Sequence, residues 1–379
     1  MPNTLYSSRI ERMKSRRKGT SDQLRIATES MRDHRYDGLE EYARLEGALN
    51  LNESWEFRGK DDSSTRYAIG AMQPVDARYT EISFETAQRI ENQLIKKLSL
   101  NLDFRVQGSV PLDIHIKGFS DVDLLIIDNQ ILTYDSEGIG NYIPTDKDSR
   151  DVILELRHTA RDALEIAFPT AHVDDNNSKS LRITGGSLQR EVDVVPSIWW
   201  DTKEYQLTKK EKDRGITIID KNKRERIFNE PFLHMQLIKD KCAQCNGGLR
   251  KSIRLLKNLK ADSKEEGLNI ELSSYDIASL MYHADVNNLK HSTYYELAVL
   301  VETHRWLNYL AHNRDIAMQL DVPNRTRKIF ESASSYEEFL KLKEMINNLV
   351  TEVLREITGN SADYYSNDKS DFLREHVIY

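Results

Sequence analysis

The sequence is poor in cysteine and in long apolar runs, and each shortage excludes a class of protein. Two cysteines in 379 residues cannot build a disulfide framework, which agrees with a reducing compartment. No apolar run approaches the roughly 18 residues that cross a bilayer, and residues 1–19 lack the apolar stretch of a signal peptide. These shortages predict a cytoplasmic protein without a membrane partner.

Excess positive charge is also missing. The formal net charge is -7, which argues against a surface built mainly to coat nucleic acid, so any anion site should be local. The basic residues cluster at 13–18, 221–226 and 249–260. We expect the first cluster, which lies near a terminus, to be a solvated or mobile helix end. No P-loop, nucleophile elbow or paired His-Asp pattern is present, which weakens kinase-type and hydrolase-type functions.

The apolar pattern changes character near residue 205, and the chain length fits about two domains. The segments before the change, in chain order, are a helix (86–100), two strands (104–108 and 122–128), a helix (150–168) and two strands (181–185 and 191–199). From residue 230 onward the pattern is almost wholly helical. We therefore expect N-terminal helices and a catalytic lobe over 1–205, a helical lobe over 206–379, and an active site in the cleft between them.

Two acids stand at the start of a buried strand. Asp121 and Asp123 flank Val122 and precede an apolar run, so on an extended strand both carboxylates point to the same face. Two such carboxylates repel each other unless a cation lies between them, and hard oxygen ligands suit Mg²⁺ bound with substrate phosphates. Upstream, Gly108-Ser109 ends a strand-like segment, where glycine permits close backbone approach and a following helix N-terminus would offer N–H groups to a phosphate. The stretch predicts a site for a metal and a triphosphate.

A third acid strengthens this hypothesis, because an Asp-x-Asp pair alone also occurs on ordinary surface strands. Asp193 lies between Val192 and Val194 in another strand-like segment. An aspartate within an apolar strand is costly unless it is paired with a cation or hydrogen-bonded. The order and spacing of the Gly-Ser, the acid pair and the third acid favour a catalytic arrangement.

The Gly-Ser, the acid pair and the third acid, in this order, resemble the signature of the polymerase-beta-like nucleotidyltransferases. The segments at 229–241, 247–260 and 272–284 further resemble the helical lobe of the CD-NTases, bacterial relatives of cyclic GMP-AMP synthase that make cyclic oligonucleotide second messengers in antiphage defence. The resemblance covers roughly residues 85–330. It implies an α+β fold, with a mixed central sheet in the nucleotidyltransferase lobe, followed by the C-terminal helical lobe.

The helical lobe carries a basic stripe. Arg250, Arg254 and Lys257 are spaced i, i+4 and i+7 and share one helix face, which is either a solvated face or a contact for the triphosphate. The resemblance implies that Lys257 contacts the nucleotide phosphates. It also implies that Ser274 matches the family's serine and that Tyr275 matches its tyrosine that stacks on a base. Taken alone, the serine would be read as part of a helix N-cap and the tyrosine as a core residue.

The resemblance implies metal-dependent nucleotide transfer with release of pyrophosphate. Asp121, Asp123 and Asp193 would bind two Mg²⁺ (or Mn²⁺) ions, and Asp193 could also accept the proton of the acceptor hydroxyl. The residues expected to hold the substrate are Gln107, Gly108, Ser109, Arg250, Arg254, Lys257, Ser274 and Tyr275. The expected partners are the NTP substrates, an effector that is reached through the nucleotide product, and a regulatory protein or small ligand. Duplex nucleic acid is not expected to be required.

Other readings stay open. A linear-oligonucleotide or RNA/tRNA-tailing nucleotidyltransferase would carry the same acids, as would an NMP-transferring toxin, although a minimal toxin would lack the long helical lobe. A non-catalytic nucleotide-binding scaffold would keep the same fold. Cys242-x-x-Cys245 has a zinc-like spacing, but there is no second cysteine pair and His234 is the only near third ligand, so we expect two half-buried helix residues there. A Gly-Gly-Ser at 185–187 predicts a hairpin turn.

Overall fold

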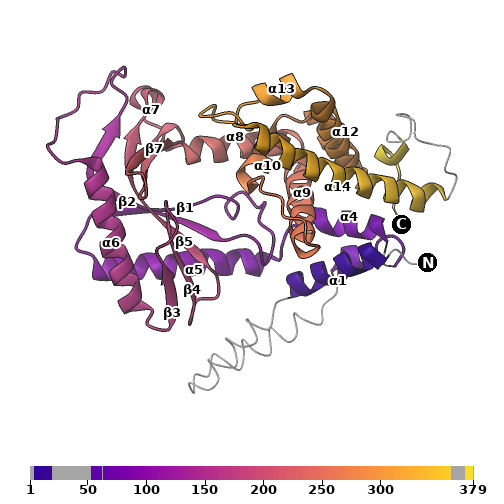
Figure 1. The fold of residues 1–379 in the computed structure, drawn as a ribbon, viewed down its shortest axis with the longest axis horizontal. Helices are drawn as coiled ribbons and strands as arrows, with labels where there is room; N and C mark the ends of the chain where they lie inside the picture. Colours follow the sequence, from indigo (N-terminus) through magenta and orange to yellow (C-terminus); the bar gives the residue numbers. More distant parts are fainter. Residues whose placement is uncertain (1–3, 19–52, 62, 360–371, 379) are drawn as a thin grey trace. The chain divides into compact units, whose positions relative to one another are not determined.

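The computed structural model describes residues 4–18, 53–61, 63–359 and 372–378, and the chain divides into two compact units (Figure 1). The sheet unit comprises Asp76–Asp113 and Ser120–Leu237. The helical unit comprises Met1–Val75, Ile114–Phe119 and Ile238–Tyr379.

The sheet unit is built on a seven-stranded mixed sheet. Its strands are β1 (Leu102–Gln107), β2 (Val122–Tyr134), β3 (Ala171–Asp174), β4 (Leu181–Gly185), β5 (Val192–Asp201), β6 (Gly215–Asp220) and β7 (Glu225–Asn229). The order is β1-β2-β5-β4-β3, and β6 pairs with β5 and with β7. β2 and β5 run parallel, whereas the other pairs are antiparallel. The helices of this unit are α5 (Ala77–Lys97), α6 (Ser149–Ala167), α7 (Lys203–Thr208) and the 3-10 helix η2 (Glu211–Asp213).

Helices α5 and α6 cover one face of the sheet (Figure 1). Alternate residues of β2, Val122 and Leu124, are at most 1% exposed and pack in one core with Ile90 of α5 and Leu156 of α6. Because side chains alternate along a strand, this packing directs Asp123 to the opposite face. The apolar core therefore fixes the strand that carries the predicted acid.

Local signals in the sequence start both covering helices. Asp76 and Asp148 are the N-cap residues of α5 and α6, and their carboxylates accept the N–H groups of Arg78 and Arg150. Apolar residues recur at helical spacing along both elements and face the sheet. Capping and burial of one face together determine where the two helices begin and how they pack.

The helical unit is organised around α9 (Gly248–Glu265). Its other elements are α1 (Thr4–Lys18), η1 (Ser54–Phe57), α4 (Ser64–Met72), α10 (Ser274–Tyr282), α11 (Val286–Lys290), η3 (His291–Thr293), α12 (Ala298–His312), α13 (Arg314–Gln319) and α14 (Ala333–Thr358). α8 (Pro231–Gln244) spans the boundary between the units in the chain. α9 packs against α4, α10, α12 and α14, which makes it the central helix of this unit.

The structure confirms the strands expected at β1, β2, β4 and β5 and the helices expected at α5 and α6. It differs from the expected domain boundary at residue 205. β6 and β7 follow that residue and extend the sheet. The described residues before Asp76 belong to the helical unit, because α1 packs on α4 and α4 packs on α9. The cleft expected between two lobes stays a prediction.

Candidate active site

Polar side chains form one row across four adjacent strands of the sheet unit. The register pairs Gln107 of β1 with Asp123 of β2, and Asp123 with Asp193 of β5. Asp193 is paired in turn with Arg182 of β4. Residues directly opposite each other on neighbouring strands point to the same face of a sheet. Asp121 stands two residues before Asp123, so the predicted acids are neighbours on one face.

Sequence reasoning missed Arg182. Its Nη2 donates a hydrogen bond to Asp121 Oδ2 at 2.6 Å, and its Nε donates to Asp193 Oδ1 at 3.0 Å. The Asp193 hydrogen bond, followed by the Asp121 charge, raises the pKa of the guanidinium. The available signal was alternation, because Leu181 and Ile183 on either side are fully buried and leave Arg182 on the other face of β4.

The three acids supply the right donor atoms for a hard divalent cation. They offer carboxylate oxygens from neighbouring strands, which suits Mg²⁺ or Mn²⁺. In the part of the chain that the structure describes, no three His, Cys, Asp or Glu side chains converge as a group of metal ligands. The Arg182 guanidinium lies between two of the three carboxylates. The acids therefore fit the metal by chemistry and by strand register, and convergence on an ion requires this guanidinium to move.

Gly108 occupies a position that only glycine fits. Its φ is 80°, in the left-handed region that L-residues rarely adopt. A Cβ atom at this position would lie 2.3 Å from Asp123 Oδ2. The glycine therefore lets the backbone pass directly beside a predicted metal ligand, and Ser109 follows it half-buried.

The helix expected after the Gly-Ser is not formed. Residues 108–121 are all described and contain turns and irregular backbone only. Pro111 has no N–H to donate, and Asp113 adopts a left-handed φ of 54° while its N–H closes a turn on the carbonyl of Val110 at 3.0 Å. The segment that follows Gly108 therefore offers no helix N-terminus to a phosphate.

Arg190 positions the backbone next to the acids. Its Nη2 donates to the carbonyl of Ser120 at 3.1 Å, and its Nε donates to Ser83 Oγ at 3.2 Å. The guanidinium also lies 3.7 Å from the ring centroid of Tyr79, and burial lowers its pKa. Because Ser120 directly precedes Asp121, these contacts fix the start of β2.

The basic stripe expected on α9 is not a solvated face. Arg254 and Lys257 are each 4% exposed, and Arg250 is half-buried. Arg254 Nη1 donates to the carbonyl of Met72 at 2.9 Å, which satisfies a carbonyl at the C-terminal end of α4. Arg254 thus has a structural contact inside the helical unit, while contacts of these side chains with a triphosphate stay predictions.

A cavity of about 440 Å³ in the helical unit is lined by three lysines of α9, Lys257, Lys260 and Lys264. They are spaced i, i+3 and i+7, so they share one helix face. The predicted substrate residue Ser274 also lines the cavity, as does the acid Glu271. Burial lowers the pKa of the Lys260 ammonium. The structure therefore brings together two predicted residues, Lys257 and Ser274, with two lysines that sequence reasoning missed; their signal was the i, i+3, i+7 spacing.

The two predicted residues at the start of α10 have distinct surroundings. Ser273 is the N-cap and accepts a backbone N–H of the first turn at 3.0 Å, whereas Ser274 is exposed. Tyr275 is half-buried, and its hydroxyl donates to Asn324 Oδ1 at 3.2 Å. The guanidinium of Arg327 lies 5.2 Å from its ring centroid. The ring is thus anchored at its hydroxyl end, and its stacking on a base stays a prediction.

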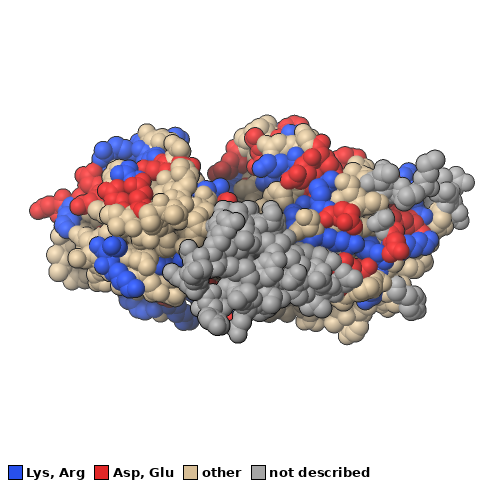
Figure 2. All heavy atoms as spheres, turned by 90° about the horizontal axis from the view of Figure 1, so that it is seen from below, with Lys and Arg blue, Asp and Glu red and all other residues tan. Residues whose placement is uncertain are grey.

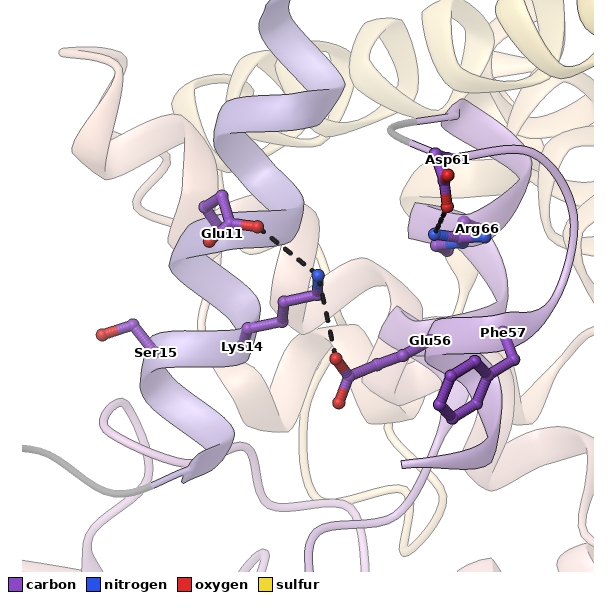
Figure 3. Close-up of a pocket in the computed structure, with 7 residues that line it drawn as sticks. All are labelled: Glu11, Lys14, Ser15, Glu56, Phe57, Asp61 and Arg66. Atoms are coloured by element: carbon purple, nitrogen blue, oxygen red, sulfur yellow. Dashed lines mark hydrogen bonds and ion pairs between the residues drawn. The ribbon is translucent and has the colours of Figure 1, made fainter. Parts of the chain in front are cut away.

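A second cavity, of about 580 Å³, lies among α1, η1 and α4 of the helical unit (Figure 3). Its charged side chains pair with one another: Lys14 lies 3.4 Å from Glu11 and 3.7 Å from Glu56, and Arg66 lies 2.5 Å from Asp61. No predicted site residue lines this cavity. Its two basic side chains are each paired with an acid of the same lining, and the cavity brings no predicted catalytic group together.

The expectation of a solvated or mobile end for the basic cluster at 13–18 is wrong for its two central arginines. Arg16 Nη1 lies 2.8 Å from Asp262 of α9, and Arg17 Nη2 lies 2.6 Å from Glu53. Their side chains are 12% and 9% exposed, because acids of the same unit lie opposite them. On the face drawn in Figure 2, basic and acidic side chains are interspersed.

Two minor expectations concern cysteine and glycine. The expectation of two half-buried helix residues is wrong: Cys242, in α8, and Cys245, in the turn after this helix, are 2% and 0% exposed. Cys245 Sγ accepts the N–H of Leu249 at 3.3 Å. The hairpin turn is confirmed, because Gly185 and Gly186 have positive φ and connect the antiparallel pair β4 and β5. In the described part of the chain, no helix is long and apolar enough to cross a membrane.

Known proteins share this combination of sheet and helical unit. A family model of the cGAS/DncV-like nucleotidyltransferase C-terminal helical domain matches residues 236–353. The chain is 76% identical to the cyclic dinucleotide synthase CdnE of Yersinia aleksiciae over 379 residues, which is 100% of both proteins. The chain belongs to the CD-NTase family. The expected enzyme class, a nucleotidyltransferase that makes cyclic oligonucleotides, is thereby confirmed, and divalent metal is general in this family.

More distant CD-NTases extend the similarity. The c-di-GMP synthase of Lachnospiraceae bacterium (strain RUG226) is 30% identical over 285 residues, which cover 68% of this chain and 80% of that protein. The STING-associated CdnE c-di-GMP synthase from Capnocytophaga granulosa matches in structure with a TM-score of 0.66 at 26% identity, covering 91% of this chain and 97% of that chain. This structure confirms the expected α+β nucleotidyltransferase fold with a helical C-terminal part.

Proposed function

We propose that this CD-NTase joins two nucleoside triphosphates into a cyclic dinucleotide and releases pyrophosphate, and that Asp121, Asp123 and Asp193 are its catalytic residues. The observation that carries the residue assignment is the strand register, which aligns Asp123 with Asp193 across parallel strands. The similarity to a cyclic dinucleotide synthase over the full chain supports the product class.

The three acids hold two Mg²⁺ or Mn²⁺ ions. When bound, such ions neutralise the charge of the triphosphate and lower the pKa of the acceptor hydroxyl. Asp193 is the residue that accepts the proton of this hydroxyl, since its side chain is more shielded from water than that of Asp121, at 14% exposed compared with 34%. Arg190 keeps the backbone before Asp121 in place for this chemistry.

The substrate phosphates are held by cations and backbone rather than by covalent chemistry. Gln107, Gly108 and Ser109 lie at the end of β1, where the left-handed glycine keeps the backbone close to Asp123. In the helical unit, Lys257 and Ser274 contact the phosphates, and Lys260 and Lys264 add positive charge to the same cavity. Tyr275 stacks on a base. Arg250 and Arg254 support this region, the latter through its bond to Met72.

GTP is the first substrate to test, because three similar proteins are described as c-di-GMP synthases. The product acts as a second messenger in antiphage defence, and its effector is a protein that binds a cyclic dinucleotide. The similar synthase from Capnocytophaga granulosa is described as STING-associated, which supports an effector of this kind. We expect a regulatory protein or small ligand to control synthesis.

The test is to incubate the purified protein with each NTP and with all four, in Mg²⁺ or Mn²⁺, and to identify phosphatase-resistant products by mass spectrometry. The matched control is the double variant Asp121→Ala/Asp123→Ala, which should give no product while its circular dichroism spectrum stays near that of the native protein. The fold survives because loss of the pair also relieves their mutual repulsion. An unchanged yield from the double variant would refute the assignment, and linear products alone would refute cyclisation.

A further inference from the structure

Arg182 makes its main ion pairs with two of the three proposed metal ligands. The Nη2 atom lies 2.6 Å from Asp121 Oδ2, and Nε and Nη2 lie 3.0 and 3.3 Å from the two oxygens of Asp193. A weaker contact of 4.0 Å joins Nη1 to Glu191. One guanidinium therefore bridges carboxylates that come from the start of β2 and from β5.

Packing does not require a basic residue at this position. Leu181 and Ile183 face the buried core, whereas Arg182 lies on the opposite face, directly across from Asp193 in the register. Its side chain remains 39% exposed. A long side chain with this exposure has room to adopt other rotamers. Packing therefore does not force Arg182 into its present contacts with the two aspartates.

A divalent ion and this guanidinium compete for the same oxygens. An ion held by all three acids needs oxygens of Asp121 and Asp193, which at present accept hydrogen bonds from Arg182. A cation placed there would also repel the guanidinium at short range. The lack of a converged ligand group in the described residues agrees with this competition.

We propose that Arg182 is the counter-ion of the metal-free site: it neutralises Asp121 and Asp193 until divalent ions bind, and its displacement sets the affinity for metal. This inference rests on the proposed function, which supplies the metal. Arg182 is thus a positioning residue that stops the acids from repelling one another in the unloaded enzyme. The triphosphate brings negative charge and offers the displaced guanidinium a new partner.

The test measures Mn²⁺ binding to the full chain without nucleotide, from the electron paramagnetic resonance signal of free Mn²⁺. Arg182→Met removes the competing charge, and Arg182→Gln removes the charge while keeping hydrogen-bonding capacity. Loss of two part-exposed ion pairs should tighten Mn²⁺ binding by about threefold to thirtyfold in both variants. Melting temperature without metal should fall, and saturating Mn²⁺ should remove most of that difference.

Arg105→Met is the matched control. Arg105 lies on β1 of the same sheet, is 35% exposed and pairs with Glu211 at 2.8 Å, which is not a proposed ligand. Its Mn²⁺ affinity should equal that of the native protein. Equal or weaker Mn²⁺ binding by both Arg182 variants would overturn the inference and leave the metal site standing. Native protein that binds Mn²⁺ no better than Asp121→Ala/Asp123→Ala would instead refute the metal site itself, and the inference with it.

Discussion

Gly108 lies where there is no space for a side chain, because the backbone passes directly beside Asp123, a proposed metal ligand. Its left-handed φ of 80° costs an L-residue about 1 to 2 kcal/mol, and a Cβ atom would also lie 2.3 Å from an Asp123 oxygen. The first effect acts on stability. The second acts on the position of a ligand, and the two effects can be separated.

Gly108→Ala should lower the rate of product formation by about 100-fold, because moving a catalytic group by roughly 1 Å has effects of this size. The matched variant is Gly185→Ala, since Gly185 has a φ of 77° but a Cβ atom there would meet no other atom within 4 Å. Both variants should lose about 1 to 2 kcal/mol of unfolding free energy. If the two variants lost activity equally, backbone strain alone would explain the loss, and the contact of the new Cβ atom with Asp123 would not.

Tyr275 has two candidate roles, stacking on a base of the substrate and packing within the helical unit. Stacking of an aromatic ring on a base contributes about 1 to 3 kcal/mol, so Tyr275→Ala should weaken nucleotide binding by about one to two orders of magnitude. Tyr275→Phe keeps the ring and removes the 3.2 Å hydrogen bond to Asn324, so it should keep near-native affinity. Calorimetric titration with a non-hydrolysable NTP measures both. Retained affinity in the alanine variant, with a large fall in melting temperature, would make Tyr275 a packing residue instead.

At the scale of the element, α9 combines two roles on one helix. Its apolar residues form the centre of the helical unit, and its lysines at 257, 260 and 264 line one cavity. Lys257 is almost fully buried, whereas Lys264 at the C-terminal end is exposed. A substitution of Lys264 can therefore test the charge of the cavity with little effect on packing.

Lys264→Glu should raise the KM for the NTP by about tenfold with little change in kcat. A phosphate contact far from the reacting atoms stabilises the bound substrate and the transition state equally. Lys290→Glu is the control, since Lys290 is an exposed lysine of the same unit that does not line the cavity. Steady-state kinetics at low and high salt measure the effect, which should shrink as salt rises. The same KM in both variants would remove Lys264 from the phosphate site.

Elements also show what could be predicted from the sequence and what could not. Apolar runs of strand length and helical spacing were sufficient for β2, β5, α5 and α6, whose burial depends on local pattern. The row that joins Gln107, Asp123 and Asp193 depends on which strands are neighbours, and the resemblance to a known family supplied that information. Arg182 was missed because its importance arises only from the pairing of β4 with β5. The fixed position of α1 was missed for a similar reason, because the acids that pair with its arginines, such as Asp262, are far away in the sequence.

At the scale of the whole molecule, many charged side chains lie in pairs of opposite sign. The formal net charge is -7, and basic and acidic side chains are interspersed on the face drawn in Figure 2. Arg9, Arg12 and Arg16 of α1 pair with Glu266 and Asp262, at distances from 2.5 to 3.3 Å. These arginines therefore join α1 to α9 and its C-terminal end within the helical unit, and their charge is already paired with acids.

We predict that synthesis requires neither duplex DNA nor duplex RNA. A duplex-binding surface needs Lys and Arg spread along one face, and its affinity falls steeply as salt rises because counterions are released. Here the arginines of α1 are already paired, and three lysines of α9, at 257, 260 and 264, line a cavity with Ser274. Product formed with long duplex DNA or RNA at low salt should stay within about twofold of that formed without it.

Salt is the discriminating variable in this experiment, because neutralising Arg16 would break its pair with the buried Asp262 and so confuse binding with folding. The cleaner probe is the exposed pair Lys96 and Lys97 at the end of α5, which can be replaced by alanine without loss of a buried contact. Strong stimulation by a duplex that declines as salt is raised would overturn the prediction. Its disappearance in the double lysine variant would then place the duplex on the sheet unit, whereas its persistence would place it elsewhere on the chain.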